Sequence, residues 1–227
     1  APIMTSRGCP FRCAYCHIST ERGADSFAGQ IGDLRLHSIK RVIDEIDYVK
    51  SLGVRKVFFE DDSLLAERER VKQIFMSIAD RGLSISNVNG INLVHLFDRS
   101  NTRSDGSWPV DEEYLDILRA AGFDQMVFPV ESGSARILRD YATNKVSLRR
   151  MDLVHLMGEM TRRGINAPVN MMMGFPDETE TEIAESVALA RRLRDAGAPY
   201  VTFFIPIPFP GSKLFYMAID KGYLSSD

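Results

Sequence analysis

Thr5-Ser6-Arg7-Gly8-Cys9-Pro10-Phe11-Arg12-Cys13-Ala14-Tyr15-Cys16 contains every cysteine of the 227-residue chain. The first two cysteines are separated by three residues and the last two by two residues. Three thiolates on one short loop can hold a metal centre, but they leave a tetrahedral ion, or one iron of a cubane cluster, without a protein ligand. The stretch therefore predicts an incomplete metal site with one position open to another ligand.

Three kinds of cysteine site can be weighed on this spacing. An odd number of cysteines and no signal peptide argue against disulfides, so we expect metal-bound thiols in a reducing, cytoplasmic compartment. Structural zinc usually takes two pairs with two-residue spacers, or a Cys pair completed by His. His17 directly follows Cys16, so the chain would have to double back for both to reach one ion. A 4Fe-4S cluster is the favoured interpretation, and zinc on a non-catalytic scaffold stays open as an alternative.

With Tyr15 directly before the last cysteine, the pattern Cys-x3-Cys-x2-Cys resembles that of the radical S-adenosylmethionine (radical SAM) superfamily. The resemblance implies that Cys9, Cys13 and Cys16 hold a 4Fe-4S cluster and that SAM binds the fourth iron through its amino and carboxylate groups. Residues 5–11 resemble more narrowly the cobalamin-associated and methylthiotransferase branches. Cobalamin, bound by a domain outside this chain, is therefore a further implied cofactor.

The composition is that of an ordinary globular protein, with 44% hydrophobic residues, 26% charged residues and a net charge of -3. It gives no reason to expect nucleic acid as a partner. No apolar run approaches the about 18 residues of a membrane-spanning helix, so we expect no membrane partner. The length suits one α/β domain. We expect residues 1–227 to form a radical SAM core domain cut from a longer chain with flanking domains, such as an upstream cobalamin-binding domain.

Helix-like and strand-like segments alternate along the chain. Apolar periodicity predicts helices over residues 39–52, 67–81, 111–121, 150–163 and 178–196. Apolar and β-branched runs predict strands over residues 3–6, 54–59, 83–89, 125–130, 167–173 and 200–205. The long connections imply parallel strands with right-handed crossovers. A doubly wound sheet fits the same alternation, but the resemblance selects a six-stranded partial (β/α)6 barrel of the TIM type, in the α/β class.

The carboxyl ends of parallel strands are where α/β folds place their sites, and an acidic triplet follows the second predicted strand. Glu60, Asp61 and Asp62 could begin and cap the next helix. Three consecutive acids also concentrate negative charge that a cationic ligand would relieve. In the family, this position binds the α-amino group of SAM, and Asp62 aligns with the glutamate of the usual Gly-Gly-Glu pattern. Glu60 and Asp61 depart from that pattern.

The ends of the third and fourth predicted strands supply further SAM candidates. Asn89 belongs to an Asn-Gly pair, which is first a turn signal. The stretch Glu131-Ser132-Gly133-Ser134 resembles the family's ribose and carboxylate motif, which implies that Glu131 accepts from the ribose hydroxyls and that Ser132 contacts SAM. Its serines could instead cap the following helix. Lys145 is a candidate for the SAM carboxylate, with a solvated surface lysine as the alternative.

The last two predicted strands end in Met173 and Pro206. Residues 174–179 resemble a family string near which the backbone touches adenine, although methionines are more often core residues. Pro206 begins a segment resembling the Pro-x-Pro-Gly-Thr of the same branch, and its alternating prolines must end the strand. Tyr15, Met173 and Pro206 complete the predicted SAM contacts. A long polar loop over residues 96–108 is expected near the mouth of the barrel.

The resemblance implies a radical SAM enzyme that cleaves SAM reductively to a 5'-deoxyadenosyl radical, which abstracts hydrogen from a substrate. We expect a cobalamin-dependent methylation or cyclisation of a small molecule or peptide, with an electron donor such as flavodoxin or ferredoxin. The alternatives are a methylthiotransferase of RNA or ribosomal protein, which needs a second three-cysteine cluster, and the zinc-bound scaffold. The sequence assigns no residue to the chemical step itself.

Overall fold

Two parallel sheets form the centre of the computed structural model, which describes residues 1–19, 30–143 and 145–225. Their strands, in spatial order, are β1 (Pro2–Ile3), β4 (Lys56–Phe59), β5 (Ser84–Asn87) and β6 (Phe123–Met126) in the first sheet, and β7 (Phe128–Glu131), β8 (Val169–Met172) and β9 (Val201–Phe204) in the second. All neighbouring strands within these sheets run parallel. The prediction of an α/β fold with parallel strands is confirmed.

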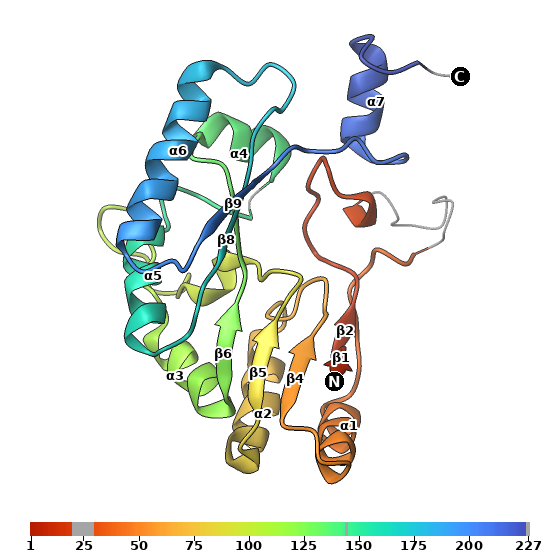
Figure 1. The fold of residues 1–227 in the computed structure, drawn as a ribbon, viewed down its shortest axis with the longest axis vertical. Coiled ribbons are helices and arrows are strands. Elements are labelled where there is room, and N and C mark those ends of the chain that lie inside the picture. The colour runs from red at the N-terminus through yellow and green to blue at the C-terminus, as the bar shows by residue number, and fades with distance from the viewer. Residues whose placement is uncertain (20–29, 144, 226–227) are drawn as a thin grey trace.

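The five predicted helices are all present, each shorter than predicted by one to four residues. They are α1 (Ile39–Ser51), α2 (Arg68–Ile78), α3 (Glu112–Ala121), α5 (Leu153–Arg162) and α6 (Glu180–Asp195). At the starts of α1, α3, α5 and α6 a side chain accepts backbone hydrogen bonds, as Asp111 does for α3 and Thr179 does for α6. The helices turn their apolar faces toward the sheets and lie around them in Figure 1.

Shorter elements fill the connections. These are the 3-10 turns η1 (His17–Ser19), η2 (Ala79–Arg81) and η3 (Leu93–Leu96), and the helices α4 (Ala135–Tyr141) and α7 (Lys213–Asp220). Within the described residues, no helix combines the length and the apolar character needed to cross a membrane.

The strand predicted over residues 125–130 divides into β6 and β7 at Val127. Met126 N donates to Asn166 O at 2.9 Å and Phe128 N donates to Pro168 O at 2.8 Å, so backbone hydrogen bonds continue from one sheet to the next. The register of β7 against β8 shifts between Pro129 and Glu131, where proline supplies no N–H to the ladder. The two sheets therefore adjoin along this segment.

The first predicted strand is also divided. β1 pairs with β4, whereas β2 (Ser6–Arg7) pairs antiparallel with β3 (Arg35–Leu36) and leads directly into the cysteine loop, residues 8–16. The arrowheads of β4, β5 and β6 point toward the edge above which this loop rises, and α7 lies beside it (Figure 1). Leu214 N donates to Ala14 O at 2.8 Å, which joins α7 to the loop.

Candidate functional site

The cysteine loop is held by its backbone from several sides. Cys9 N donates to Gly32 O at 3.1 Å, and Ala14 N donates to Tyr141 O at the end of α4 at 2.7 Å. Cys13 is buried, Cys9 and Cys16 are partly exposed, and no disulfide joins them. Backbone hydrogen bonds to two other segments therefore position the loop that carries the three thiols.

Two acidic residues of the predicted triplet hold the chain that enters this loop. Asp61 is fully buried and accepts from Thr5 N at 3.0 Å, from Thr5 Oγ1 at 2.8 Å and from Ser6 Oγ at 2.6 Å. Asp62 Oδ2 accepts from Gly8 N at 2.8 Å. Glu60 is exposed, and its carbonyl accepts from Asn89 Nδ2 at 2.8 Å. The acidic segment thus orders the cysteine loop, and Asn89 ties the ends of neighbouring strands.

Gly8, directly before Cys9, packs closely against the backbone of Gly32 and Asp33. Its φ of +80° lies in the region that favours glycine. A Cβ atom added there would stand 2.2 Å from Asp33 O, a contact that neither backbone could tolerate. Only glycine therefore fits immediately before Cys9.

Tyr15, Glu131 and Lys145 meet beside the cysteines. Glu131 Oε1 accepts from Tyr15 Oη at 2.9 Å and from Lys145 Nζ at 2.6 Å. Burial raises the pKa of Tyr15 well above its usual value, and the Glu131 carboxylate raises it further. Burial by itself would lower the pKa of Lys145, but Glu131, Cys13 and Cys9 together more than offset it and the pKa is raised. The pair is therefore a carboxylate and an ammonium held together in a largely dry site.

The same charges act on the thiol of Cys13. Burial raises its pKa to about 11, while the Lys145 ammonium acts in the opposite direction. Cys13 Sγ lies 3.7 Å from Ala142 O. A buried thiol binds metal only as the thiolate, and a cation beside it favours that form.

The remaining SAM candidates lie at the strand ends but have partners of their own. Ser132 is buried with its Oγ 3.1 Å from Ser186 Oγ in α6, and it accepts from Ser134 N at 3.0 Å. Met173 is partly exposed and donates its N–H to Phe204 O at 3.0 Å, and Pro206 is buried. The structure gathers Tyr15, Glu131 and Lys145 into one cluster, whereas Ser132 faces α6.

Asn92 is a contact that the sequence reasoning missed. It is 5% exposed, donates to Ser63 Oγ at 2.7 Å and lies with Nδ2 3.9 Å from Cys9 Sγ. Its position just before the apolar stretch of η3 was the available signal that the side chain turns inward. A polar donor near the sulfur of Cys9 can stabilise a thiolate there.

The cysteine donor set is of the kind that holds an iron-sulfur cluster. Among the described residues, no three His, Cys, Asp or Glu side chains come together closely enough to hold one metal ion. In a cubane cluster each thiolate binds a different iron, so the sulfurs need not converge on one point. Cys9, Cys13 and Cys16 can therefore serve as three cluster ligands, with Lys145 and Asn92 nearby to favour thiolates.

Comparisons with known proteins concern the family and the fold of the chain. The family model for the radical SAM superfamily matches residues 3–190. The uncharacterized methyltransferase PH0819 of Pyrococcus horikoshii is 29% identical over 223 residues, which cover 98% of this chain and 42% of that protein. Cytidylyl-2-hydroxyethylphosphonate methyltransferase of Streptomyces wedmorensis is 25% identical over 229 residues, which cover 99% of this chain and 38% of that protein. A tRNA-2-methylthio-N(6)-dimethylallyladenosine synthase of Koribacter versatilis is 26% identical over 195 residues, which cover 82% of this chain and 39% of that protein. The chain thus spans about two fifths of the methyltransferases' length.

The fold recurs in solved structures of the radical S-adenosylmethionine methyltransferase TsrM from Kitasatospora setae. The structure with cobalamin and a 4Fe-4S cluster superposes with a TM-score of 0.73 at 19% identity, over 97% of this chain and 37% of that one. A second structure, with tryptophan substrate and the SAM analogue aza-SAM, gives the same TM-score. At this identity the likeness concerns the fold.

Proposed function

Because the chain belongs to the radical SAM superfamily, we propose that it is the SAM-cleaving core of a methyltransferase. The predicted radical SAM enzyme, with a 4Fe-4S cluster and SAM as cofactors, agrees with that membership. The observation that carries the proposal is the junction of the three-cysteine loop with the Tyr15, Glu131 and Lys145 cluster. Methyltransferases among the matching relatives support the class of reaction.

Cys9, Cys13 and Cys16 would hold the cluster on the loop. When bound, the cluster and SAM supply the electron transfer and the 5'-deoxyadenosyl radical that removes hydrogen from a substrate. Gly8, held by Asp62, fixes where the loop begins, and the buried surroundings of Cys13 exclude water. These residues position the thiols.

Glu131 and Lys145 are proposed to orient SAM. Both hydrogen bonds to the Glu131 carboxylate use Oε1, and in the described part of the chain Oε2 accepts from no other residue. Oε2 can then accept from ribose hydroxyls while Tyr15 and Lys145 hold the carboxylate in place. Lys145 has donor capacity for the SAM carboxylate in addition to its bond to Glu131. The other predicted SAM contacts stay predictions, and they are Glu60, Asp61, Asp62, Asn89, Ser132, Met173 and Pro206.

The proposal includes a six-stranded partial barrel. If β6 and β7 are counted as one strand interrupted at Val127, the parallel strands number six and form a partial barrel. Strand pairing runs through β1, β4, β5 and β6 in the first sheet and through β7, β8 and β9 in the second, and within the described residues none joins β9 to β1. A barrel open on that side leaves room for a substrate and for flanking parts of a longer protein.

Cobalamin-dependent methyl transfer is the proposed overall reaction. TsrM, which shares the fold, was solved with cobalamin, and its substrate is tryptophan. Cobalamin would be bound outside these 227 residues, the substrate would be a small molecule or peptide, and a flavodoxin or ferredoxin would supply electrons. Methylthiotransferase activity is the alternative, and a second three-cysteine cluster elsewhere in the full-length protein would favour it.

The test uses the full-length protein, purified and reconstituted without oxygen. We expect about four irons per chain, 5'-deoxyadenosine after reduction with SAM, and stoichiometric binding of added cobalamin. Stoichiometric zinc without iron would overturn the enzyme proposal. Iron and 5'-deoxyadenosine without cobalamin binding would retain the radical SAM core and reject the methyl transfer.

A further inference from the structure

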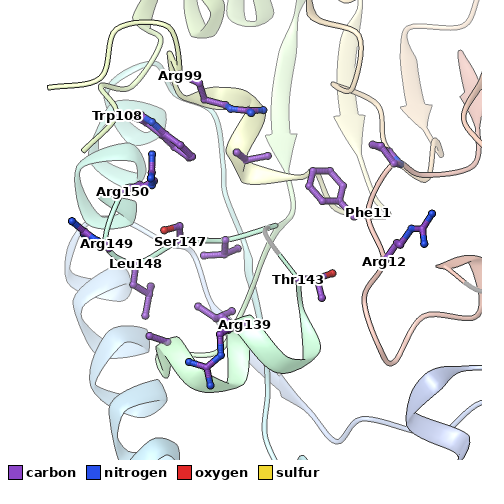
Figure 2. A pocket seen from close by; sticks show the side chains of 15 residues that line it. Phe11, Arg12, Arg99, Trp108, Arg139, Thr143, Ser147, Leu148, Arg149 and Arg150 are labelled. Atoms are coloured by element: carbon purple, nitrogen blue, oxygen red, sulfur yellow. The ribbon is translucent and has the colours of Figure 1, made fainter. Parts of the chain in front are cut away.

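A pocket of about 820 Å³ lies beside the cysteine loop, outside the cluster of Tyr15, Glu131 and Lys145 (Figure 2). Its basic lining residues come from four separate segments of the chain and are Arg12, Arg99, Arg139, Arg149 and Arg150. None of the lining residues that the structure describes is acidic. Five arginines and no carboxylate in one concavity stand out in a chain with a net charge of -3.

Most of this positive charge is not neutralised by the protein. Arg139 pairs with Asp140 at 2.9 Å. Arg12, Arg99, Arg149 and Arg150 have no carboxylate partner anywhere in residues 1–19, 30–143 and 145–225. Like charges gathered in one pocket repel each other, and an anion bound between them would relieve that repulsion.

Two of the guanidinium groups are held in place by an aromatic ring. Arg99 and Arg150 lie 5.7 and 5.0 Å from the centre of the Trp108 ring. Figure 2 shows these three residues together at one end of the pocket, with the ring of Phe11 at the opposite end. Such stacking orders long side chains before a ligand arrives and so reduces the entropy lost on binding.

The shape and the lining together indicate the class of ligand. The volume lies within the range of small-molecule sites, whereas a protein partner would need a broad surface. Phe11, Leu138 and Leu148 give the pocket apolar walls that suit a ring or base. Guanidinium groups bind phosphate through paired hydrogen bonds. We propose that the pocket binds a phosphate-bearing small molecule of nucleotide size.

This site is separate from the proposed SAM site, and the inference goes beyond the proposed function. The pocket shares no lining residue with the predicted SAM contacts. Its Pro10, Phe11 and Arg12 lie between two predicted cluster ligands, and Thr143 and Val146 lie on either side of Lys145 in the sequence. A ligand in the pocket would therefore touch the cysteine loop while leaving the SAM position vacant for SAM.

The test measures binding of cytidine diphosphate and of inorganic pyrophosphate to the full-length protein by isothermal titration calorimetry at low salt. We expect both probes to bind, cytidine diphosphate more tightly because of its base. The double variant R99Q/R150Q should weaken binding of cytidine diphosphate at least about tenfold. The control R55Q/R191Q removes the same charge from exposed arginines outside the pocket and should leave binding unchanged.

Three results would overturn the inference. One is the absence of binding by either probe. Another is equal weakening in R99Q/R150Q and R55Q/R191Q, which would indicate only general attraction to positive charge. The third is occupation of these arginines by another ligand, seen as displacement of cytidine diphosphate by SAM or as binding of a short RNA or of flavodoxin in its place. Unchanged melting temperatures of both variants would establish that they are folded. Because no readout requires a cluster, failure here is distinguishable from failure of the proposed function.

Discussion

Lys145 Nζ lies 2.6 Å from Glu131 Oε1, and the two side chains are 12% and 7% exposed. Each charge would be costly to bury alone, and each is stabilised by the other. Glu131 also adopts a φ of +70°, an uncommon conformation for a residue with a side chain. Such a paired and strained residue beside a predicted metal loop is typical of a functional site.

Breaking this pair should be more costly than removing it. Glu131→Gln and Lys145→Met should each lower the free energy of unfolding by about 3 kcal/mol or more, because each leaves a buried charge without its counter-charge. The double variant should lose less than the sum of the two. Chemical denaturation of all three proteins measures the coupling. The exposed pair of Lys40 and Asp44, also at 2.6 Å, is the control and should show little coupling. Additive losses at Glu131 and Lys145 would contradict the assignment.

Asp61 should be essential for the order of the cysteine loop. Asp61→Ala removes the acceptor for Thr5 and Ser6 and leaves buried donors unsatisfied, so we expect a loss of about 3 kcal/mol in unfolding free energy. Iron loading should fall with it. Glu60→Ala is the matched control, because that neighbouring carboxylate is exposed. If the two variants load iron equally, the acidic segment does not hold the loop.

Gly8 should tolerate no side chain. Gly8→Ala would place Cβ 2.2 Å from Asp33 O, and we expect the displaced loop to lose most of its iron-sulfur absorbance after reconstitution. Gly53→Ala is the control, because Gly53 has a similar positive φ but no atom within 4 Å of the added Cβ. It measures the effect of backbone strain without a steric collision. Equal absorbance in Gly8→Ala and Gly53→Ala would show that the close approach is unimportant.

His95 should make stability fall in acid. Burial, together with Arg99 and Arg68, lowers the pKa of His95 to about 4, so the unfolded chain takes up this proton before the folded protein does. The contribution of neutral His95 to the free energy of unfolding is complete above pH 6.5. It is lost as the pH falls toward 4, at about 1.4 kcal/mol per pH unit. Unfolding free energies at pH 7 and pH 5 measure the loss. His95→Phe, which keeps a ring against Phe11, should have a smaller pH dependence. An unchanged dependence would locate the effect elsewhere.

The alternation of helices and strands was predictable because it depends on local periodicity and on turn residues. The break at Val127 was not, since it depends on hydrogen bonds to Asn166 and Pro168, which are distant in sequence. The same limit applies at the first strand, where Ser6 and Arg7 pair with β3 instead of extending β1.

The candidate site divides in the same way. Tyr15, Glu131 and Lys145 were singled out from motifs, and the structure brings them together. The motifs could not indicate that the Asp61 carboxylate accepts hydrogen bonds from Thr5 and Ser6, because those partners lie more than fifty residues away in the sequence.

The arginine pocket was invisible in the sequence for a related reason. Its basic residues come from distant segments, and an overall charge of -3 conceals their convergence. Trp108, the one tryptophan in the sequence, gave no sign of the two arginines that pack against it.

The central claim is that the loop of Cys9, Cys13 and Cys16 holds a 4Fe-4S cluster with one iron open to SAM. Electron paramagnetic resonance of the reduced, reconstituted protein, recorded with and without SAM, tests it most directly. We predict a cluster signal whose shape changes when SAM is added, and its loss in Cys13→Ala. A spectrum that is the same with and without SAM, or a cluster that persists in Cys13→Ala, would contradict the account.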